Sequence, residues 1–523
     1  MSIGKAGKNL SLNINIEKSK RHKIGQTKAN MLVAILYQIF SAACGLILPR
    51  YILRYFGSDV NGMLQTIGQF LTYTVLMESG VGGLVMASFY KPLAEKDEKA
   101  VSDIFLNTKK FFARISYVYF GLVLLLCLCV KFIIRTDFDF PYVAGMVLIL
   151  SCNYYFNYYF AMAHRILLRA DQKIRVIQSV QIVTMLVNLA VSIIAIKLSC
   201  GIHAVKLIST LIYLSNPLIF RLYVRKHYAI GKAVYDENRT IPRKSSAMIH
   251  HMAFFVHANT DIVLLSLFNG TKEVSVYSVY NSVVYTLENF FVAISDALSG
   301  SIGQLLATNQ KDKLRYTFET YRLANTVAAT FICVAEALLI VPFVSVYTKD
   351  VTDINYLRPL FAGILVTAQW FYCVRIPYNC VIYAAGHYEQ TKFGAYLEVI
   401  LNLGISLALI KPLGMVGVAL GTAIAMAARS VYMAWYLSKQ ILHRPLHLFF
   451  KEILLYGIAA AGIWFGLHRF IPSTVQDLTS WVIIACISSV GALIPIAICV
   501  ILFDRKHLFS ILARKRNSKG ERA

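Results

Sequence analysis

The segment NLAVSIIAIK at residues 188–197 returns as NLGISLALIK at residues 402–411, and this repetition decides the fold. The two segments are identical at 5 of 10 positions and lie 214 residues apart. Earlier in each half, YFGSDVNGM at residues 55–63 corresponds to LFNGTKEVSVY at residues 267–277, with an offset of 212 from Phe56 to Phe268. Because polar loops match in the same order as apolar segments, the pattern indicates an internal duplication.

The composition is that of an integral membrane protein. Of the 523 residues, 57% are hydrophobic and 15% are charged, whereas soluble proteins carry about 25% charged residues. An apolar helix of about 20 residues crosses the hydrocarbon core of a bilayer. The sequence predicts 14 such segments, which begin near Ala29, Asn61, Lys110, Phe140, Ile174, Ile202, Ala247, Val274, Phe318, Tyr356, Tyr388, Gly414, Lys451 and Thr479.

The duplication and the apolar segments together predict the architecture. The first 12 segments form two blocks of six, so the blocks are parallel repeats about an axis along the membrane normal, as in transporters that rock one half against the other. We expect an all-α membrane protein with two six-helix bundles and two additional C-terminal helices. The expected parts are a basic tail (1–28), the first bundle (29–228), a linker (229–246), the second bundle (247–440), two additional transmembrane helices (441–503) and a second basic tail (504–523).

Lysine and arginine indicate the orientation in the membrane. The net charge is +25, and most basic residues fall in alternate connecting segments, which the positive-inside rule assigns to the cytoplasm. Both termini are therefore expected to be cytoplasmic. Basic residues placed between apolar segments do not form the single basic face that nucleic acid requires. We therefore expect contacts with anionic membrane lipids and no nucleic-acid partner.

Several longer motifs resemble one family. RYILRYFGSDVNGMLQTIGQFLTYTVLMESGVGG (50–83), YKPLAEKD (90–97) and NTDIVLLSLF (259–268) resemble the polysaccharide transporter family, as do VPFVSVYTKDVTDINY (341–356) and RIPYNCVIYAAGHYEQTKF (375–393). This family contains the flippases for lipid-linked oligosaccharides of bacterial capsule, O-antigen and related pathways. It belongs to the superfamily that also holds the multidrug and toxin extrusion (MATE) proteins and the lipid II flippase.

The resemblance implies a fold and a function. The fold would consist of two MATE-like bundles that face a central cavity lined chiefly by segments one, two, seven and eight. The function would be alternating access that moves a polyprenyl-diphosphate-linked oligosaccharide outward across the bacterial cytoplasmic membrane for cell-surface polysaccharide synthesis. A polysaccharide polymerase and glycosyltransferases of the same pathway would be partners.

Three arginines are candidate ligands for the substrate diphosphate, because guanidinium offers paired donors and stays charged. Arg50 and Arg54 lie four residues apart behind Pro49, on one helical face near an end of the first segment. Arg375 lies within the tenth segment, two residues before Pro377, where an arginine needs a partner.

Ionisable side chains in or beside the apolar segments are candidates for ion coupling or gating. A proton-coupled or sodium-coupled transporter needs a carboxylate whose charge changes during the conformational cycle, and a histidine titrates near neutral pH. The candidates are Asp261, Glu78, Glu288, Asp296 and His257. For each acid, a fixed salt bridge or a helix-end contact is the alternative role.

Asp261 and Arg50 form a candidate gate. The repeat offset of 212 residues carries Asp261 onto Pro49, next to Arg50, and pseudo-symmetric positions lie at equal depth. One hypothesis is that the two side chains attract each other when the outer side closes. The alternative is that Asp261 pairs permanently with a neighbour inside its own bundle.

Two other classes of function compete with a flippase. An exporter of small cationic drugs on the same fold is kept open by the 31 tyrosines. A membrane polysaccharide polymerase or glycosyltransferase would need a larger external loop or a cytosolic domain, and the sequence contains no phosphate loop or HExxH motif. The ten cysteines show no CxxC spacing, so neither a metal site nor a cofactor is expected. We therefore expect a transporter and not an enzyme.

Overall fold

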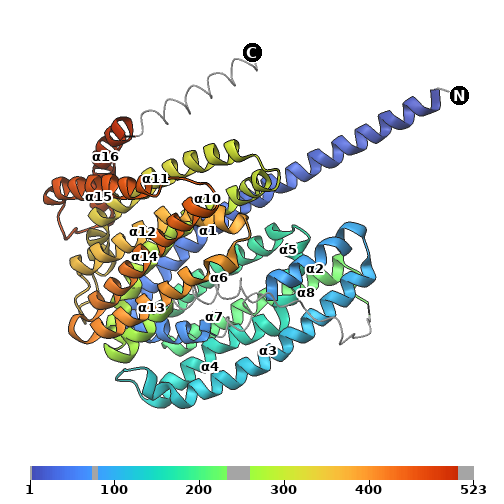
Figure 1. Cartoon of the computed structure of the whole chain (residues 1–523). Coiled ribbons are helices and arrows are strands. Elements are labelled where there is room, and N and C mark those ends of the chain that lie inside the picture. The colour runs from blue at the N-terminus through green and yellow to red at the C-terminus, as the bar shows by residue number, and fades with distance from the viewer. Residues whose placement is uncertain (1–2, 74–80, 232–258, 504–523) are drawn as a thin grey trace. The chain divides into compact units, whose positions relative to one another are not determined.

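The computed structural model describes residues 3–73, 81–231 and 259–503, and Figure 1 shows their helices. No β-strand occurs in these ranges, which confirms the all-α fold class. The α-helices are α1 (Ile3–Tyr73), α2 (Val81–Glu95), α3 (Glu98–Ile133), α4 (Phe140–Phe156), α5 (Met162–Ala170), α6 (Ile174–Lys197), α7 (Ile202–Tyr213), α8 (Ser215–His227), α10 (Thr271–Ala307), α11 (Lys311–Tyr347), α12 (Pro359–Ala384), α13 (Tyr388–Leu413), α14 (Met415–Gln440), α15 (His447–Leu467) and α16 (Leu478–Phe503). A π-helix (Asn157–Ala161), a 3₁₀-helix (His468–Phe470) and a short apolar helix (Asn259–Phe268) complete the set.

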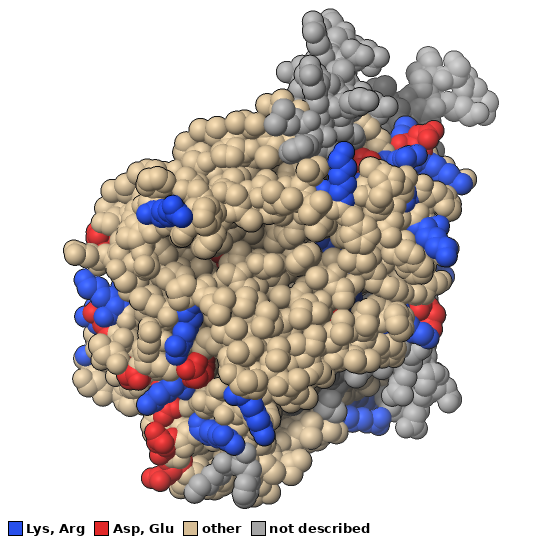
Figure 2. Space-filling model, turned by 60° about the vertical axis from the view of Figure 1, so that its left-hand side comes forward, with Lys and Arg blue, Asp and Glu red and all other residues tan. Residues whose placement is uncertain are grey.

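Within the described ranges, 11 helices are long and apolar enough to cross a membrane. The 14 predicted segments map onto the helices in order. The first two segments share α1, which turns at Gly57. The fourth segment is divided by the π-helix, and the seventh is described only as the short helix Asn259–Phe268. Uncharged side chains cover most of the face in Figure 2, as expected for helices that contact lipid.

The chain forms two compact units. The first comprises Met1–Tyr51, Gly80–Cys129 and Phe140–Arg243, and the second comprises Ile52–Ser79, Val130–Asp139 and Lys244–Ala523. Residues 52–73, which the sequence assigns to the first repeat, therefore pack with helices of the second repeat.

Two glycines mark the duplication in the backbone. Gly57 has φ 82° and ψ 176°, and Gly270 has φ 88° and ψ 173°. L-residues with a side chain rarely adopt such a positive φ. Each glycine is followed directly by a helix, so the motifs YFGSDVNGM and LFNGTKEVSVY build the same turn into the second helix of each repeat.

The contact between α13 and α14 depends on small residues. A Cβ atom at Gly417 would overlap the carbonyl group of Leu409, and one at Gly421 would overlap the Oγ atom of Ser406. Small residues let helices approach closely in membranes. Polar groups on α13 and α14 are therefore within hydrogen-bonding distance of each other.

The two additional C-terminal helices pack on α11. Ile463 of α15 and Ile496 of α16 form a buried cluster with Val334 and Leu338 of α11. An ion pair between Arg322 of α11 and Glu452 of α15 links the same elements, and both side chains are buried.

Candidate functional site

Asp261 lies on the short helix Asn259–Phe268 and is 4% exposed. Its carboxylate accepts hydrogen bonds of 2.9 Å from the hydroxyl groups of Tyr277 on α10 and Thr422 on α14. The Thr422 oxygen in turn accepts a 2.9 Å hydrogen bond from the side-chain amide of Asn402 on α13. Asp261 therefore lies inside the second unit, in contact with polar groups from separate helices.

Further oxygen atoms surround this group. The Ser406 hydroxyl on α13 lies 3.4 Å from the main-chain oxygen of Val418, and the Thr422 hydroxyl lies 3.2 Å from the same oxygen. We call Asp261, Tyr277, Asn402, Ser406 and Thr422 the Asp261 site. Carboxylate, hydroxyl, amide and carbonyl oxygens are the ligands that hard cations prefer, and a carboxylate can also take a proton.

The first unit contains the equivalent amide without the acid. Asn188 of α6 is the repeat mate of Asn402, and its side-chain oxygen accepts hydrogen bonds from Ser192 at 3.3 Å and Ser209 at 2.6 Å. At the offsets of 212, 213 and 214 residues that the repeated motifs give, the positions equivalent to Asp261 are Pro49, Leu48 and Ile47, and none of them is acidic. Only the second unit therefore pairs this buried amide with a carboxylate at that position.

Sequence reasoning identified Asp261 but not its partners. A signal for Asn402 and Ser406, two other residues of the Asp261 site, was present, because asparagine and serine are among the five identities between the repeated segments at residues 188–197 and 402–411. Nothing in the sequence marked Tyr277 or Thr422, since hydroxyl side chains occur throughout the apolar segments.

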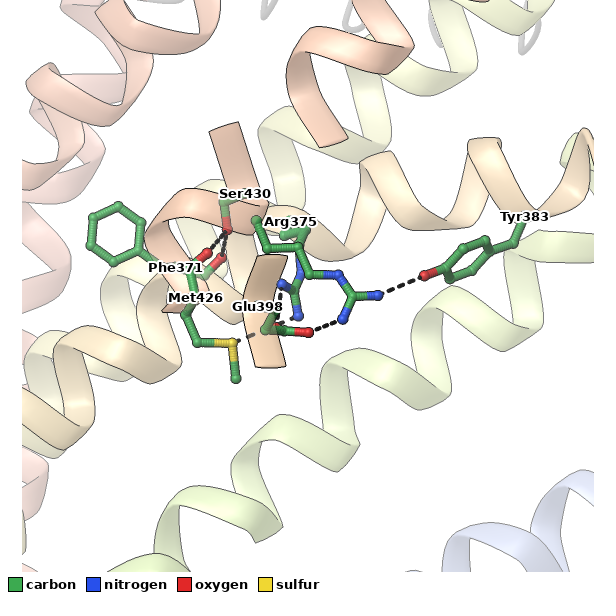
Figure 3. A network of polar contacts seen from close by, with 7 residues as sticks. Phe371, Arg375, Tyr383, Glu398, Met426 and Ser430 are labelled. Carbon is green, nitrogen blue, oxygen red and sulfur yellow. Dashed lines mark hydrogen bonds and ion pairs between the residues drawn. The ribbon is translucent and has the colours of Figure 1, made fainter. Parts of the chain in front are cut away.

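Arg375 lies inside the second unit and is 2% exposed (Figure 3). Its guanidinium donates to Glu398 of α13 over 2.9 Å, and Glu398 also pairs with Arg429 of α14. Arg429 donates to the Tyr383 hydroxyl at 3.2 Å, and Arg375 lies over the Tyr372 ring. In this conformation Arg375 is bound to a protein carboxylate, and its contact with substrate phosphate stays a prediction.

The other predicted site residues lie apart from Asp261 or outside the described residues. Arg54 is exposed and pairs with Asp350 at 3.4 Å, and Arg50 is half-buried at the end of the first unit's part of α1. Asp296 is exposed on α10. Glu288 is half-buried on α10 and lies within electrostatic range of Arg375.

Glu78 and His257 lie outside the described residues. Arg50 and Asp261 belong to different units, so the gate between them stays a prediction. The described partners of Asp261 agree with the alternative, in which it contacts neighbours in its own bundle.

A second polar cluster joins residues 52–73 to the loop between α11 and α12. The backbone N–H and the hydroxyl of Ser58 donate to Asp353 over 2.8 and 2.6 Å. The Tyr356 hydroxyl lies 2.6 Å from that of Ser58 and 2.9 Å from that of Ser275. Asn61 donates to Ser275 over 2.8 Å. We call these five residues the Tyr356 cluster.

Apart from the carboxyl group of Asp353, the Tyr356 cluster consists of hydroxyl and amide groups, which are neutral. Burial raises the pKa of the Tyr356 hydroxyl to about 12, although hydrogen bonds with Ser275 and Ser58 oppose the rise. Tyr356 therefore stays neutral at physiological pH. Asp353 accepts from the Ser58 N–H at the start of the helix that follows Gly57, a position that favours a negative charge.

The long apolar helices define a multi-pass membrane protein. Residues 247–410, which include Asp261, Arg375 and Glu398, match the MatE family model. No curated protein sequence matches the chain significantly.

Solved structures show which proteins share the fold. The lipid II flippase MurJ in an inward closed conformation is similar over 91% of this chain and 100% of its own, with TM-score 0.66 and 14% identity. The MATE multidrug transporter DinF-BH is similar over 80% of this chain and 96% of its own, with TM-score 0.59 and 16% identity. An inward-facing multidrug resistance MATE transporter of the MOP superfamily is similar over 78% of this chain and 96% of its own, with TM-score 0.55 and 10% identity. The chain thus shares its fold with the MATE and MurJ structures, and residues 247–410 match the MatE model.

Proposed function

We propose that the protein is a flippase that moves a polyprenyl-diphosphate-linked oligosaccharide across the bacterial cytoplasmic membrane, with both termini in the cytoplasm. One observation favours a flippase over a drug exporter. The likeness to MurJ covers 91% of the chain, whereas the likeness to the two multidrug transporters covers 78–80%. The helices α15 and α16 lie outside the two repeats and pack on α11, so the fuller match favours a flippase.

The Asp261 site supports cation coupling. An ionisable group in a membrane helix is costly and is retained where it has a role, and Asp261 accepts hydrogen bonds from the hydroxyl groups of Tyr277 on α10 and Thr422 on α14. We propose that a proton or a sodium ion binds Asp261 in one conformation. The bound cation stabilises that conformation by its differential affinity for the two states.

We propose that Arg50 and Arg54, four residues apart in α1, bind the substrate diphosphate. Arg54 is exposed and held by a single surface ion pair with Asp350. Such a pair contributes little stability, so a diphosphate can displace the carboxylate. We propose that the Tyr356 cluster, which joins residues 52–73 to the loop between α11 and α12, separates when this end of the second unit opens.

Deletion of the gene tests the flippase proposal. Mass spectrometry of membrane lipids should show that an oligosaccharide linked to a polyprenyl diphosphate accumulates on the cytoplasmic side. Wild-type chain supplied in trans should clear it, and the double variant Arg50→Gln/Arg54→Gln should not. A deletion strain with unchanged lipid-linked intermediates and raised sensitivity to cationic dyes would instead support the drug exporter.

A further inference from the structure

A cavity of about 460 Å³ lies at one end of the second unit, where the loop between α11 and α12 meets the loop before α16. The C-terminal end of α11, residues 349–357 and residues 474–476 line it. Cavities of about 300–1,000 Å³ have the size that holds small molecules in proteins. None of the site residues predicted from the sequence lines this cavity. It is therefore a candidate binding site distinct from the Asp261 site.

Hydrogen bonds hold the walls of the cavity together. The backbone N–H of Val475 donates to the Ser345 hydroxyl over 3.0 Å, and the Lys349 ammonium donates to the main-chain oxygen of Gln476 over 3.1 Å. Within the first loop, the carboxamide oxygen of Asn355 accepts a 2.9 Å hydrogen bond from the backbone N–H two residues on. The walls are thus already formed, which lowers the cost of binding a ligand.

The lining combines polar groups with apolar surface. Seven of its eleven residues are polar, and the exposed side chains of Thr474 and Gln476 present a hydroxyl and an amide. Val351, Ile354 and Leu357 are half-buried and apolar. A pyranose ring presents hydroxyl groups around its edge and C–H groups on its faces. The lining therefore has the chemistry that a sugar requires.

The charge of the lining comes from one residue. Of the described residues that line the cavity, Lys349 alone is charged. Three acids stand next to lining residues in the sequence, but their carboxylates are bonded elsewhere. The pairs are Asp350 with Arg54, Asp353 with Ser58, and Asp477 with Thr479 and Ser480. The cavity thus favours an anionic ligand over a cationic one.

The loop that lines the cavity also contacts the proposed diphosphate ligand Arg54. Asp350 stands between the lining residues Lys349 and Val351, and its carboxylate lies 3.4 Å from the Arg54 guanidinium. In a lipid-linked oligosaccharide the sugars follow directly on the diphosphate. A substrate whose diphosphate replaces Asp350 at Arg54 therefore brings its sugars to this loop.

We propose that the cavity binds an acidic sugar, a pyranose that carries a carboxylate. Lys349 uses one of its three N–H donors on Gln476, and the others bind the sugar carboxylate. Thr474 and the Gln476 amide bind the sugar hydroxyl groups. With both termini in the cytoplasm the cavity faces outward, and its natural ligand is an acidic sugar of the translocated oligosaccharide; this assignment rests on the proposed function.

Saturation-transfer NMR of the full-length protein in lipid nanodiscs tests the site with three probes. Methyl glucuronide is a sugar with a charge, methyl glucoside is a sugar without one, and acetate is a charge without a sugar. The glucuronide should bind about 10-fold more tightly than the glucoside, because a hydrogen bond to a charged group contributes at least this much. Acetate at the same concentration should not displace it.

Variants assign the preference to Lys349. Lys349→Gln should lower the affinity for the glucuronide to that for the glucoside, whereas Lys349→Arg should keep the preference. Lys411→Gln is the matched control, because Lys411 is exposed and does not line the cavity. Thr474→Trp places a large side chain at the exposed rim and should block both sugars without changing the melting temperature.

Three results would overturn the proposal. They are the absence of glucuronide binding to the wild type, displacement of the glucuronide by equal acetate, and an unchanged preference in folded Lys349→Gln. The sugar probes need no transport, so the flippase proposal fails or holds separately. A deletion strain that accumulates lipid-linked oligosaccharide while the protein binds no glucuronide removes this site alone. Glucuronide binding without such accumulation supports the site and removes the flippase.

Discussion

Asp261 and Thr422 are 161 residues apart in the sequence and are joined by a 2.9 Å hydrogen bond between carboxylate and hydroxyl. The bond connects the first and the last helix of the second repeat, and Asn402 of α13 extends it. A change of charge at Asp261 therefore acts on α13 and α14 together, which is the property that a coupling site needs.

Asp261→Asn should abolish the dependence of transport on sodium or pH while the protein still folds. The amide oxygen can still accept from Tyr277 and Thr422, but it no longer carries a charge. Transport should be measured in liposomes with imposed sodium and proton gradients. Unchanged dependence on both gradients would remove Asp261 from the coupling mechanism.

Thr422→Val should weaken the apparent affinity for the coupling cation about 10-fold, the range seen when groups that orient a ligand are removed. The methyl group keeps the volume and removes the oxygen shared by Asp261 and Asn402. Thr367→Val is the matched control, because Thr367 bonds only to the main chain of its own helix among the described contacts and is exposed. Equal effects of the two variants would contradict a specific role for Thr422.

Glu398→Gln should destabilise the protein by about 3–5 kcal/mol, because Arg375 and Arg429 then share no buried anion. Thermal unfolding in detergent checks this. Glu389→Gln on the same helix is the control, since Glu389 pairs with Lys392 on the surface and should leave the melting temperature unchanged.

Gly421→Ala should destabilise the packing of α13 on α14 by about 1–3 kcal/mol, because the added Cβ overlaps Ser406 Oγ. Gly404→Ala on α13 meets no atom within 4 Å, so it should be neutral or slightly stabilising, as alanine favours helix over glycine. If both variants unfold at the same temperature, the close approach of the two helices is not required.

Asp353→Ala should open the Tyr356 cluster. It removes the acceptor of both the N–H and the hydroxyl of Ser58, so a cysteine placed at Asn61 should react faster with a membrane-impermeant maleimide added outside. Asp350→Ala is the control, because Asp350 forms only an exposed pair with Arg54 among the described contacts. Equal labelling in both backgrounds would show that the cluster does not close this end.

The sequence predicted the fold class because its signals are local and repeated. The apolar segments, and the Asn and Ser that recur in α6 and α13, can be recognised in the sequence without knowing which residues they contact. The site was predictable only in part. Asp261 stands out in an apolar segment, but the choice of Tyr277 and Thr422 as its partners depends on helix register and rotation.

The ion pair of Arg375 illustrates the same limit. A lone arginine in an apolar segment indicates that it needs an anion. The sequence alone does not show whether that anion is a substrate phosphate or the carboxylate of Glu398. Which one is present depends on how α12 and α13 pack, and that is a property of the folded chain.

The two repeats have diverged in chemistry more than in backbone. Gly57 and Gly270 still make the same turn, and Asn188 and Asn402 are still buried amides, yet residues 47–49, which correspond to Asp261, include no acid. The acid is thus present in one of the two repeats only. If Asp261 binds the coupling cation as proposed, the two halves of the chain differ in role: a gradient would act on the second half alone, and the first half would follow as a neutral counterpart.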